Sequence, residues 1–355
     1  DQTVSATTTD DDVAGFTIVE SDGSTEVDES GSTDTFTIVL NAEPTNDVVV
    51  LATDSNDEGE ATISGSVTFT SADWDTPQTI TVTGVDDSIV DGDQISTITI
   101  SVVETISDDD FDSVADETVS ATTTDDDVAG FTIVESDGST EVAESGSTDT
   151  FTVVLDAQPA SDVVLTITSD DTGEATVNSP LAFTSANWDT PQTVTITGVD
   201  DNLVDGDQAS TITISVDAAN SEDGFDGLNN ETVSVTTTDD DVAGFTIVES
   251  DGSTEVAESG STDTFTVVLD AQPASDVVLT ITSDDTGEAT VNSPLTFTPA
   301  NWDTPQTVTV TGVDDDIIDG TITSALTVSV DDANSDDDFD AVADQTVSVT
   351  TTDDD

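Results

Sequence analysis

Six residue types are missing from this sequence of 355 residues: it contains no lysine, arginine, histidine, cysteine, methionine or tyrosine. Without cysteine or lysine, neither disulfides nor lysine-based isopeptide bonds can cross-link the fold. The same absences remove the usual nucleophiles, bases and oxyanion-stabilising cations of catalysis. Paired carboxylates of the glycosidase kind remain, but here the acidic residues recur along the chain instead of gathering in one cleft. We therefore expect a protein that is not an enzyme.

Negative charge, in contrast, is abundant. The 80 aspartate and glutamate residues give a formal net charge of −80, and such self-repulsion opposes a compact state. Nucleic acid and anionic membrane surfaces are excluded as partners, because no side chain here can neutralise a phosphate. The charge implies a cation as partner, either bound at specific sites or supplied as ambient salt.

A high net charge with only 4% aromatic residues is also typical of disordered chains. Against disorder, the 34% apolar residues fall in alternating runs of valine, isoleucine, phenylalanine and threonine, which favours a folded chain. The sequence has no initiator methionine, no signal peptide and no apolar run of about 18 residues. We expect a segment of a longer protein that does not insert into a membrane.

The sequence repeats itself with a period of 114 residues, which separates Trp74, Trp188 and Trp302. Residues 125–181 recur without change as residues 239–295. This period is too long for a solenoid unit and suits an independent domain. We predict three tandem domains at residues 13–127, 128–241 and 242–355.

Residues 1–12 match the closing strand of a repeat, since Asp-Gln-Thr-Val-Ser-Ala-Thr-Thr-Thr corresponds to residues 116–124. Two explanations are open. The sequence is cut from a longer array, or this strand completes a sheet in a neighbouring molecule. We favour the first, because each repeat already carries a closing strand of its own.

Within the second repeat, apolar and polar residues alternate with the period of two that half-buried strands show. The predicted strands span residues 129–135, 150–155, 163–168, 174–177, 181–184, 192–199, 211–216 and 231–238. No helix is predicted. Seven or so short strands per repeat indicate an all-β, immunoglobulin-like antiparallel β-sandwich. Three such sandwiches in tandem indicate an elongated rod.

The same alternation assigns the core of the second repeat. The residues expected to be buried are Phe131, Ile133, Phe151, Val153, Leu155, Leu165, Ile167, Phe183, Val194, Ile196, Ile212, Ile214, Val233 and Val235. Trp188 lies in a turn, where it can either stack on a ligand or cap the end of the sandwich. We favour the capping role.

Three acidic motifs recur once per repeat. The first is a run of three aspartates at the end of each repeat: Asp125, Asp126 and Asp127; Asp239, Asp240 and Asp241; Asp353, Asp354 and Asp355. The second is Thr-Gly-Val-Asp-Asp followed by an Asp-Gly turn: Asp86, Asp87 and Asp91; Asp200, Asp201 and Asp205; Asp314, Asp315 and Asp319. The third is a glutamate that ends the first strand: Glu20, Glu135 and Glu249.

Carboxylates with no histidine or thiol exclude the usual zinc and copper sites. They suit calcium, which takes about 6–8 oxygen ligands. In a sandwich the three motifs can lie at the same end. We therefore predict several calcium ions at the joints between repeats, and a chain that folds with calcium and is loose without it.

A family resemblance supports this interpretation. Asp-Asp-Asp-Val-Ala-Gly-Phe-Thr-Ile-Val-Glu, followed by Glu-Ser-Gly and an alternating strand, resembles the junction between tandem Calx-beta domains. Val-Asp-Asp-Asp-Ile-Ile-Asp at residues 313–319 resembles the acidic segment after a late strand of the same family. The resemblance covers each repeat nearly end to end. It implies a seven-stranded sandwich that binds several calcium ions at its distal loops.

On the matching positions, the resemblance implies one ligand set per domain: the glutamate, the Asp-Asp loop and the triplet that closes that domain. It adds Asp316 to the set of the third domain. It also implies a ligand from a middle loop, for which the candidates are Glu60, Glu174 and Glu288. Gln94 and Ile322 stand where the family has a further acidic residue, which implies fewer ions per joint. The opening triplet at residues 10–12 should be the poorest site, because its partners belong to a domain that this chain lacks.

Three functions fit these observations. The first is structural: a calcium-rigidified stalk or filament segment of a large secreted or cell-surface protein, such as an adhesin or matrix fibre. Its partners would be calcium ions and neighbouring repeats or copies of itself. The second is a glycan- or partner-binding adhesion module, which the near identity of the repeats and the scarcity of aromatics disfavour. The third is a calcium-sensing regulatory domain, which the extreme acidity disfavours, because it suits a salty exterior better than cytoplasm. We favour the first function and an extracellular location.

Overall fold

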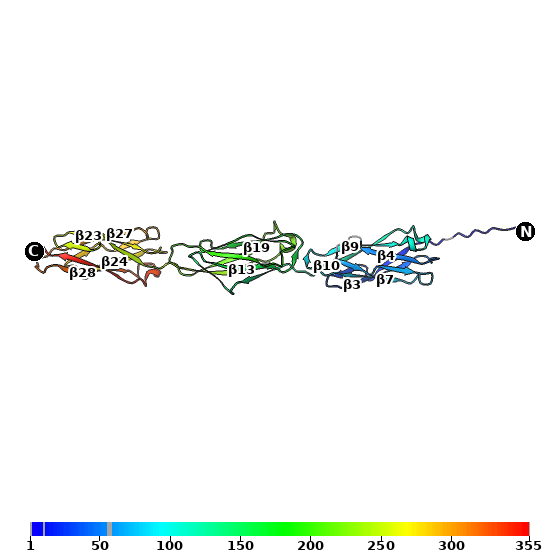
Figure 1. The fold of residues 1–355 in the computed structure, drawn as a ribbon, viewed down its shortest axis with the longest axis horizontal. Helices are drawn as coiled ribbons and strands as arrows, with labels where there is room; N and C mark the ends of the chain where they lie inside the picture. Colours follow the sequence, from blue (N-terminus) through cyan, green and yellow to red (C-terminus); the bar gives the residue numbers. More distant parts are fainter. Residues whose placement is uncertain (1, 10, 55–58, 355) are drawn as a thin grey trace.

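Alternating apolar residues produce the strands, as Thr33–Leu40 illustrates: Phe36, Ile38 and Leu40 are buried, and the residues between them are not. The computed structural model describes residues 2–9, 11–54 and 59–354. Within these residues the strands form three sandwiches, one after another along the chain. Figure 1 shows them in a straight row, with the two chain ends at opposite ends of the rod.

Each sandwich consists of a four-stranded and a five-stranded sheet. The strands of the first are β1 (Phe16–Glu20), β2 (Thr25–Asp28), β3 (Thr33–Leu40), β4 (Val48–Asp54), β5 (Ala61–Ile63), β6 (Ser66–Phe69), β7 (Gln78–Gly84), β9 (Gln94–Val102) and β10 (Glu117–Thr124). Those of the second are β11 (Phe131–Glu135), β12 (Thr140–Ala143), β13 (Thr148–Leu155), β15 (Val163–Ser169), β16 (Ala175–Val177), β17 (Leu181–Phe183), β18 (Gln192–Gly198), β19 (Gln208–Val216) and β20 (Glu231–Thr238). Those of the third are β21 (Phe245–Glu249), β22 (Thr254–Ala257), β23 (Thr262–Leu269), β24 (Val277–Ser283), β25 (Ala289–Val291), β26 (Leu295–Phe297), β27 (Gln306–Gly312), β28 (Ile322–Val330) and β29 (Gln345–Thr352).

The topology is the same in all three sandwiches. In the first, the sheet orders are β1-β3-β7-β5 and β2-β10-β9-β4-β6. Its pairings are antiparallel except that of β2 with β10, which is parallel and runs from Thr25 opposite Ala121 to Asp28 opposite Thr124. This is the predicted immunoglobulin-like β-sandwich, and the fold class is confirmed. The sheets span residues 16–124, 131–238 and 245–352, which lie inside the three predicted repeats, and the outer limits of those repeats stay a prediction.

Each sandwich has more strands than the seven or so predicted, partly because its first strand is divided between the two sheets. In the second sandwich β11 ends at Glu135, and after a turn at Gly138, whose φ is +84°, the chain continues as β12 in the opposite sheet. Strand β12 was not predicted, because Thr-Glu-Val-Ala offers one large apolar residue and no alternation.

The predicted core of the second sandwich is confirmed with two adjustments. Phe131 and Ile133, on β11, are half-buried, and the other residues of the predicted core are buried. Val142, Val163, Leu181 and Phe225 are also buried in this core, although the predicted set did not include them. As expected, Trp188 is half-buried against the core.

The described residues form no α-helix, and their only helical elements are four single-turn 3₁₀ helices that the pattern did not predict. They are η1 (Glu104–Ile106), η2 (Asp109–Phe111), η3 (Asp223–Phe225) and η4 (Asp337–Phe339). The last three each end on a buried phenylalanine. No helix among the described residues is long and apolar enough to span a membrane.

Consecutive sandwiches are joined by a loop that reaches from one into the next. We call residues 86–90, 200–204 and 314–318 the joint loops. In the first of them, strand β8 (Ile89–Val90) pairs in parallel with β14 (Gln158–Pro159) of the second sandwich. Val90 is only 9% exposed and belongs to the core of the second sandwich, not its own.

The second joint repeats this arrangement. Leu203 forms a parallel bridge with Gln272 of the third sandwich, and the backbone N–H of Val204 donates to the Gln272 carbonyl at 3.0 Å. Val204 is 9% exposed and is part of the third core. Each joint therefore combines a backbone bridge with one buried aliphatic side chain.

The glycine that ends β18 should not tolerate a side chain. A Cβ at Gly198 would lie 2.1 Å from the carbonyl oxygen of Ala143, whereas a Cβ at Gly227 would meet nothing within 4 Å. We expect Gly198→Ala to lower the free energy of unfolding of the second sandwich by about 1–3 kcal/mol, and Gly227→Ala to leave it nearly unchanged. Urea unfolding followed by Trp188 fluorescence, with the other two tryptophans replaced by phenylalanine, measures both. Equal midpoints for the two variants would contradict this account of the contact.

Candidate metal centre

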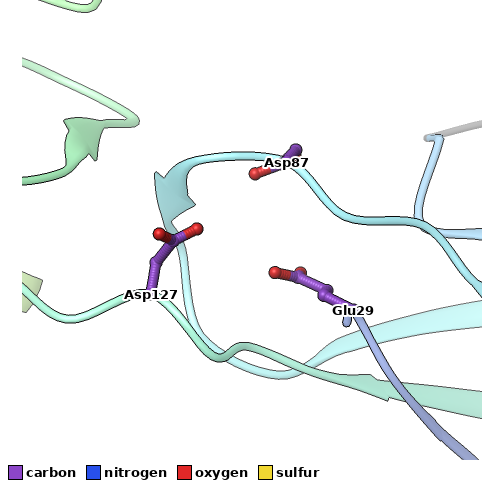
Figure 2. Close-up of side chains that lie close together, drawn as sticks. All are labelled: Glu29, Asp87 and Asp127. Atoms are coloured by element: carbon purple, nitrogen blue, oxygen red, sulfur yellow. The ribbon is translucent and has the colours of Figure 1, made fainter. Parts of the chain in front are cut away.

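Three carboxylates meet at the end of the first sandwich that faces the second. Glu29 follows β2, Asp87 lies in the joint loop after β7, and Asp127 follows β10. Carboxylate oxygens of the three lie within 4.8 Å of one another. Figure 2 shows the side chains around one common space, each supplied by a separate segment of the chain.

Similar groups occur in the other two sandwiches. They consist of Glu144, Asp239 and Asp241 in the second and of Glu258, Glu288 and Asp319 in the third. In each group the carboxylate oxygens again lie within 4.8 Å of one another. We call the three groups the joint clusters. No other acidic groups of this kind are found within the described residues.

A close approach of two backbones positions each cluster. A Cβ at Gly84 would lie 2.1 Å from the carbonyl oxygen of Asp28, so the end of β7 passes β2 at a distance that only glycine permits. On its other side β2 pairs with β10, and the backbone N–H of Glu29 donates to the Thr124 carbonyl at 3.2 Å. Glu29, the joint loop and the aspartate triplet thus start from adjacent backbone positions.

The glutamate of each cluster that follows β2 or its equivalent is deeply buried. Glu29, Glu144 and Glu258 are each 1% exposed. Their Oε2 atoms, and the Oδ2 atoms of Asp127 and Asp241, are buried without a hydrogen-bond partner in the described part of the chain.

Buried carboxylates are normally paired with a cation or hydrogen-bonded, because an uncompensated buried charge is very unfavourable. This sequence contains no lysine, arginine or histidine to serve as a partner. The compensation must then be a proton or a cation from solution. A set of carboxylate oxygens only is the donor set that calcium prefers, so the residues present fit the predicted ion.

The loop before β5 or its equivalent carries a further glutamate in each of these regions, buried in the first and third and half-buried, as Glu174, in the second. Glu60 and Glu288 are 7% and 6% exposed, and Glu288 is itself a member of the third cluster. The backbone N–H of Val85 donates to the Glu60 carbonyl at 2.9 Å, which holds this loop against the end of β7. These are two of the middle-loop residues that the family resemblance suggested.

Burial and mutual repulsion raise the pKa values of the clustered acids. Burial first, and the charges of neighbouring carboxylates second, raise the pKa of Glu29 to about 8 and that of Glu144 to about 7. The same two causes raise the pKa of Glu258, Asp127 and Asp241. Without a cation, the clusters therefore retain protons at a pH where ordinary carboxyl groups are ionised.

The first aspartate of each triplet holds the turn after the joint loop. Asp125 accepts hydrogen bonds from the backbone N–H groups of Gly92 and Asp127, both at 2.8 Å. Asp239 and Asp353 accept the equivalent bond from the glycine of the equivalent turn, at 2.8 and 2.7 Å. Their role is to fix the backbone that carries the cluster.

Of the predicted ligands, the structure brings Asp87, Asp127, Asp239, Asp241 and Asp319 into the clusters. Asp205 and Asp315 are half-buried beside them. Outside the clusters, the exposed predicted ligands are Asp86, Asp91, Asp126, Asp200, Asp201, Asp240, Asp314, Asp316 and Asp354. Asp355, like Asp10 of the opening triplet, lies outside the described residues.

The structure does not bring the predicted glutamates Glu20, Glu135 and Glu249 into the clusters. They end β1, β11 and β21, before the chain crosses to the other sheet. Glu20 accepts a hydrogen bond from the Thr25 hydroxyl at 2.9 Å, and the other two accept the equivalent bond. Their carboxylates stabilise the crossing between the two sheets.

Sequence reasoning missed Glu29, Glu144 and Glu258 as members of the clusters. A signal was available, because each of these glutamates begins the recurring Glu-Ser-Gly segment. Because the first strand was predicted as a single strand, the glutamate at its end was expected at the end of the sandwich that carries the acidic loops. The chain reaches that end only after β2, and the glutamate found there is the second one after the glutamate that was predicted.

Stability without calcium should fall as pH rises. Burial raises the pKa of Glu29 from 4.5 to about 8, so the folded state binds this proton more tightly than the unfolded chain does. The resulting stabilisation is complete below pH 4.5 and is lost as pH approaches about 8. We expect the unfolding temperature in chelator to decline across this range, and less steeply in Glu29→Gln. Added calcium should reverse the trend, because the ion binds the deprotonated carboxylates. An unfolding temperature in chelator that rises over this range would contradict the assignment.

Neither a scan against protein-family models nor a search of the curated proteins finds a match. Among solved structures, the chain is similar to the titin I-band fragment I67–I69, with 10% identity, a TM-score of 0.29 and coverage of 97% of this chain and 98% of the fragment. It is similar to domains 4–9 of the surface layer protein SbsC, with 19% identity, a TM-score of 0.26 and coverage of 97% and 48%.

The third similarity is to the calcium binding domain CBD12 of CALX1.1, with 14% identity, a TM-score of 0.24 and coverage of 56% of this chain and 79% of that one. At such identities and TM-scores these similarities carry no argument about function. The fold class rests on the sheets described above, and the function must be argued from the joints.

Proposed function

We propose that the chain is a segment of an extracellular stalk or filament whose joints are stiffened by calcium. The observation that carries the proposal is the set of buried carboxylate oxygens, Oε2 of Glu29, Glu144 and Glu258 and Oδ2 of Asp127 and Asp241, that have no hydrogen-bond donor within the described residues, in a sequence without a cationic side chain. The resemblance of residues 125–135 to the junction between tandem Calx-beta domains supports it. The role is structural and not catalytic.

Three separate segments contribute to the first cluster, and this explains how it stiffens the joint. Glu29 belongs to the end of β2, Asp127 to the connection into β11, and Asp87 to the joint loop. Calcium, when bound, supplies the positive charge that these carboxylates lack. The carboxylates then hold the three segments together, whereas without the ion their repulsion separates them.

The connection to the next sandwich is direct. Asp87 is three residues before Val90, which is buried in the second core. Because the two side chains share one short loop, fixing Asp87 also fixes the docked valine. Calcium bound to the cluster would therefore limit the angle between consecutive sandwiches.

An extracellular role implies a particular range of affinity. Extracellular calcium modules bind with dissociation constants of about 10⁻⁴–10⁻³ M, whereas intracellular sensors bind far more tightly. The net charge of −80 also suits an exterior with abundant cations. Sub-micromolar binding would favour the calcium-sensor function instead.

Replacing Glu144 should weaken calcium binding at the second joint. Glu144→Gln removes a cluster carboxylate, and we expect its site to lose about tenfold or more in affinity, as disturbed metal sites commonly do. Glu141→Gln makes the same change of charge three residues away at an exposed position and should have no effect. Isothermal titration calorimetry on the full chain measures both.

Glu135→Gln distinguishes the two assignments of the glutamate ligand. The structure gives Glu135 a hydrogen bond to Thr140, so this variant should bind calcium as the unaltered chain does. A loss as large as that of Glu144→Gln would restore Glu135 as the ligand. No loss in Glu144→Gln would contradict the site.

Removing calcium should make the rod bend. We expect small-angle X-ray scattering in calcium to give the maximum dimension of a straight row of sandwiches, as in Figure 1. In chelator at the same ionic strength, repulsion within the clusters should free the joints and shift the distance distribution to shorter values. Circular dichroism on the same samples would show whether the strands persist. An unchanged distribution would contradict stiffening by calcium.

A further inference from the structure

A cavity lies between the second and third sandwiches, where the chain passes from one to the other. Its volume is about 390 Å³. The second sandwich contributes Val204, Asp239 and Asp241 to its lining, and the third contributes Asp338 and Val342. We call it the joint cavity. Acidic side chains of two different sandwiches thus line one space.

The second joint cluster forms one wall of the joint cavity. Asp239 and Asp241 line the cavity, and their carboxylate oxygens lie within 4.8 Å of each other and of that of Glu144. Glu144 is 1% exposed, and its Oε2 atom has no hydrogen-bond partner within the described residues. The same holds for the buried Oδ2 atom of Asp241. A cation that compensates these oxygens would therefore lie beside the cavity.

Backbone hydrogen bonds hold this wall in place. Asp239 accepts hydrogen bonds from the backbone N–H groups of Asp205, Gly206 and Asp241, at 3.1, 2.8 and 2.7 Å. One carboxylate thus ties the turn after the joint loop to the aspartate triplet. These bonds position the wall without any contribution from the third sandwich.

Asp338 lines the joint cavity from the third sandwich. It is an exposed residue of η4, and the next residue, Phe339, is buried in the third core and anchors this helix. Burial raises the pKa of Asp205, and the charges of Asp239 and Asp338 are among those that add to the effect. The carboxylate of Asp338 is therefore close enough to act on the acids of the second sandwich.

At the first joint the equivalent position has no carboxylate. Gly224 of η3 corresponds to Asp338 of η4, since the two are separated by one repeat of 114 residues. A Cβ at Gly224 would lie 3.0 Å from Cγ1 of Val90, so this position touches the joint loop of the preceding sandwich. The two joints thus share a backbone arrangement and differ in charge at a position on the contact.

We propose that the second joint binds calcium between its two sandwiches, with Asp338 as a ligand supplied from across the joint. The second joint cluster holds the ion from one side, and Asp338 reaches it directly or through a bound water, both of which calcium accepts as ligands. The ion then connects two domains and not only the segments of one. The inference rests on the proposed function, and it gives the second joint a direct link that the first joint lacks.

The charge of Asp338 has opposite effects with and without the ion. Without a cation it adds repulsion between the sandwiches, because the sequence has no basic side chain to offset it. With calcium bound it adds attraction. Asp338→Asn keeps the shape of the side chain and removes the charge, so it should order the second joint in chelator and disorder it at limiting calcium. A role in packing alone would change the joint in the same direction under both conditions.

Pairs of spin labels measure the two joints separately, since the unaltered chain has no cysteine. Thr193→Cys with Thr307→Cys places labels at equivalent exposed positions of β18 and β27 and spans the second joint. Thr79→Cys on β7, with Thr193→Cys, spans the first joint in the same way. Double electron–electron resonance gives the width of each distance distribution. The calcium concentration at which a distribution has narrowed halfway is the calcium midpoint of that joint.

We expect Asp338→Asn to raise the calcium midpoint of the second joint about tenfold and to leave that of the first joint unchanged. In chelator at low ionic strength, where screening is weak, the same variant should narrow the second distribution. Asp337→Asn is the control. It removes the same charge from the neighbouring exposed residue, which does not line the joint cavity, and should have neither effect.

The first joint offers the reciprocal experiment. Gly224→Asp introduces the missing carboxylate, and Gly224→Ala introduces the same Cβ beside Val90 without the charge. We expect the calcium midpoint of the first joint to be lower in Gly224→Asp than in Gly224→Ala. Equal midpoints in these two variants would count against a ligand at this position of the 3₁₀ helix.

A second-joint midpoint that Asp338→Asn shifts no more than Asp337→Asn does would overturn the inference. A change in the same direction in calcium and in chelator would overturn it as well. In both cases, joints that still narrow with calcium would leave the proposed function standing. Distributions that calcium alters at neither joint would overturn the proposed function and this inference together.

Discussion

The whole arrangement depends on the repulsion between carboxylates that the fold brings together with no cation of its own. Strand β2 is held between the end of β7, which only a glycine allows so close, and the parallel strand β10. These backbone contacts bring the carboxylates of Glu29, Asp87 and Asp127 close together. Folding and the uptake of a cation or a proton are therefore one equilibrium and not two. Burial of the apolar core stabilises the folded sandwich, and the clustered carboxylates determine the ionic conditions under which it stays folded.

The joint loop connects this electrostatic problem to the assembly of the rod. Within five residues the first joint loop presents an aspartate to the cluster of its own sandwich and a valine to the core of the next. The aspartate also accepts a hydrogen bond from the residue just before that valine. The position of the valine thus depends on the state of the cluster. Joints without linkers become possible because one loop belongs to two domains.

The fold class and most of the second core could be predicted, because a period of two and a repeat of 114 residues depend only on local pattern. The Asp-Asp loops and triplets could be placed at one end for the same reason. The place of Glu29 and its equivalents in the clusters could not be predicted. The first strand crosses from one sheet to the other at a turn, and the local pattern of the sequence does not show how the chain pairs after that turn. The burial of Val90 in the neighbouring sandwich could not be predicted either. Val90 has the pattern of an ordinary strand residue, and only the contact between two domains shows that it is buried outside its own sandwich.

The parallel pairing of β2 with β10 has a consequence for a fibre under tension. Load on a tandem array enters a sandwich through its first strands and leaves through β10, and the strands lie along the rod in Figure 1. Pulling then slides β2 and β10 past each other, so that the hydrogen bonds between Thr25–Asp28 and their partners share the force instead of opening one at a time. The cluster sits at the ends of these two strands. A cation bound there would act as a clamp on the pair that tension shears, and the calcium content of the surroundings would set the force at which the fibre yields.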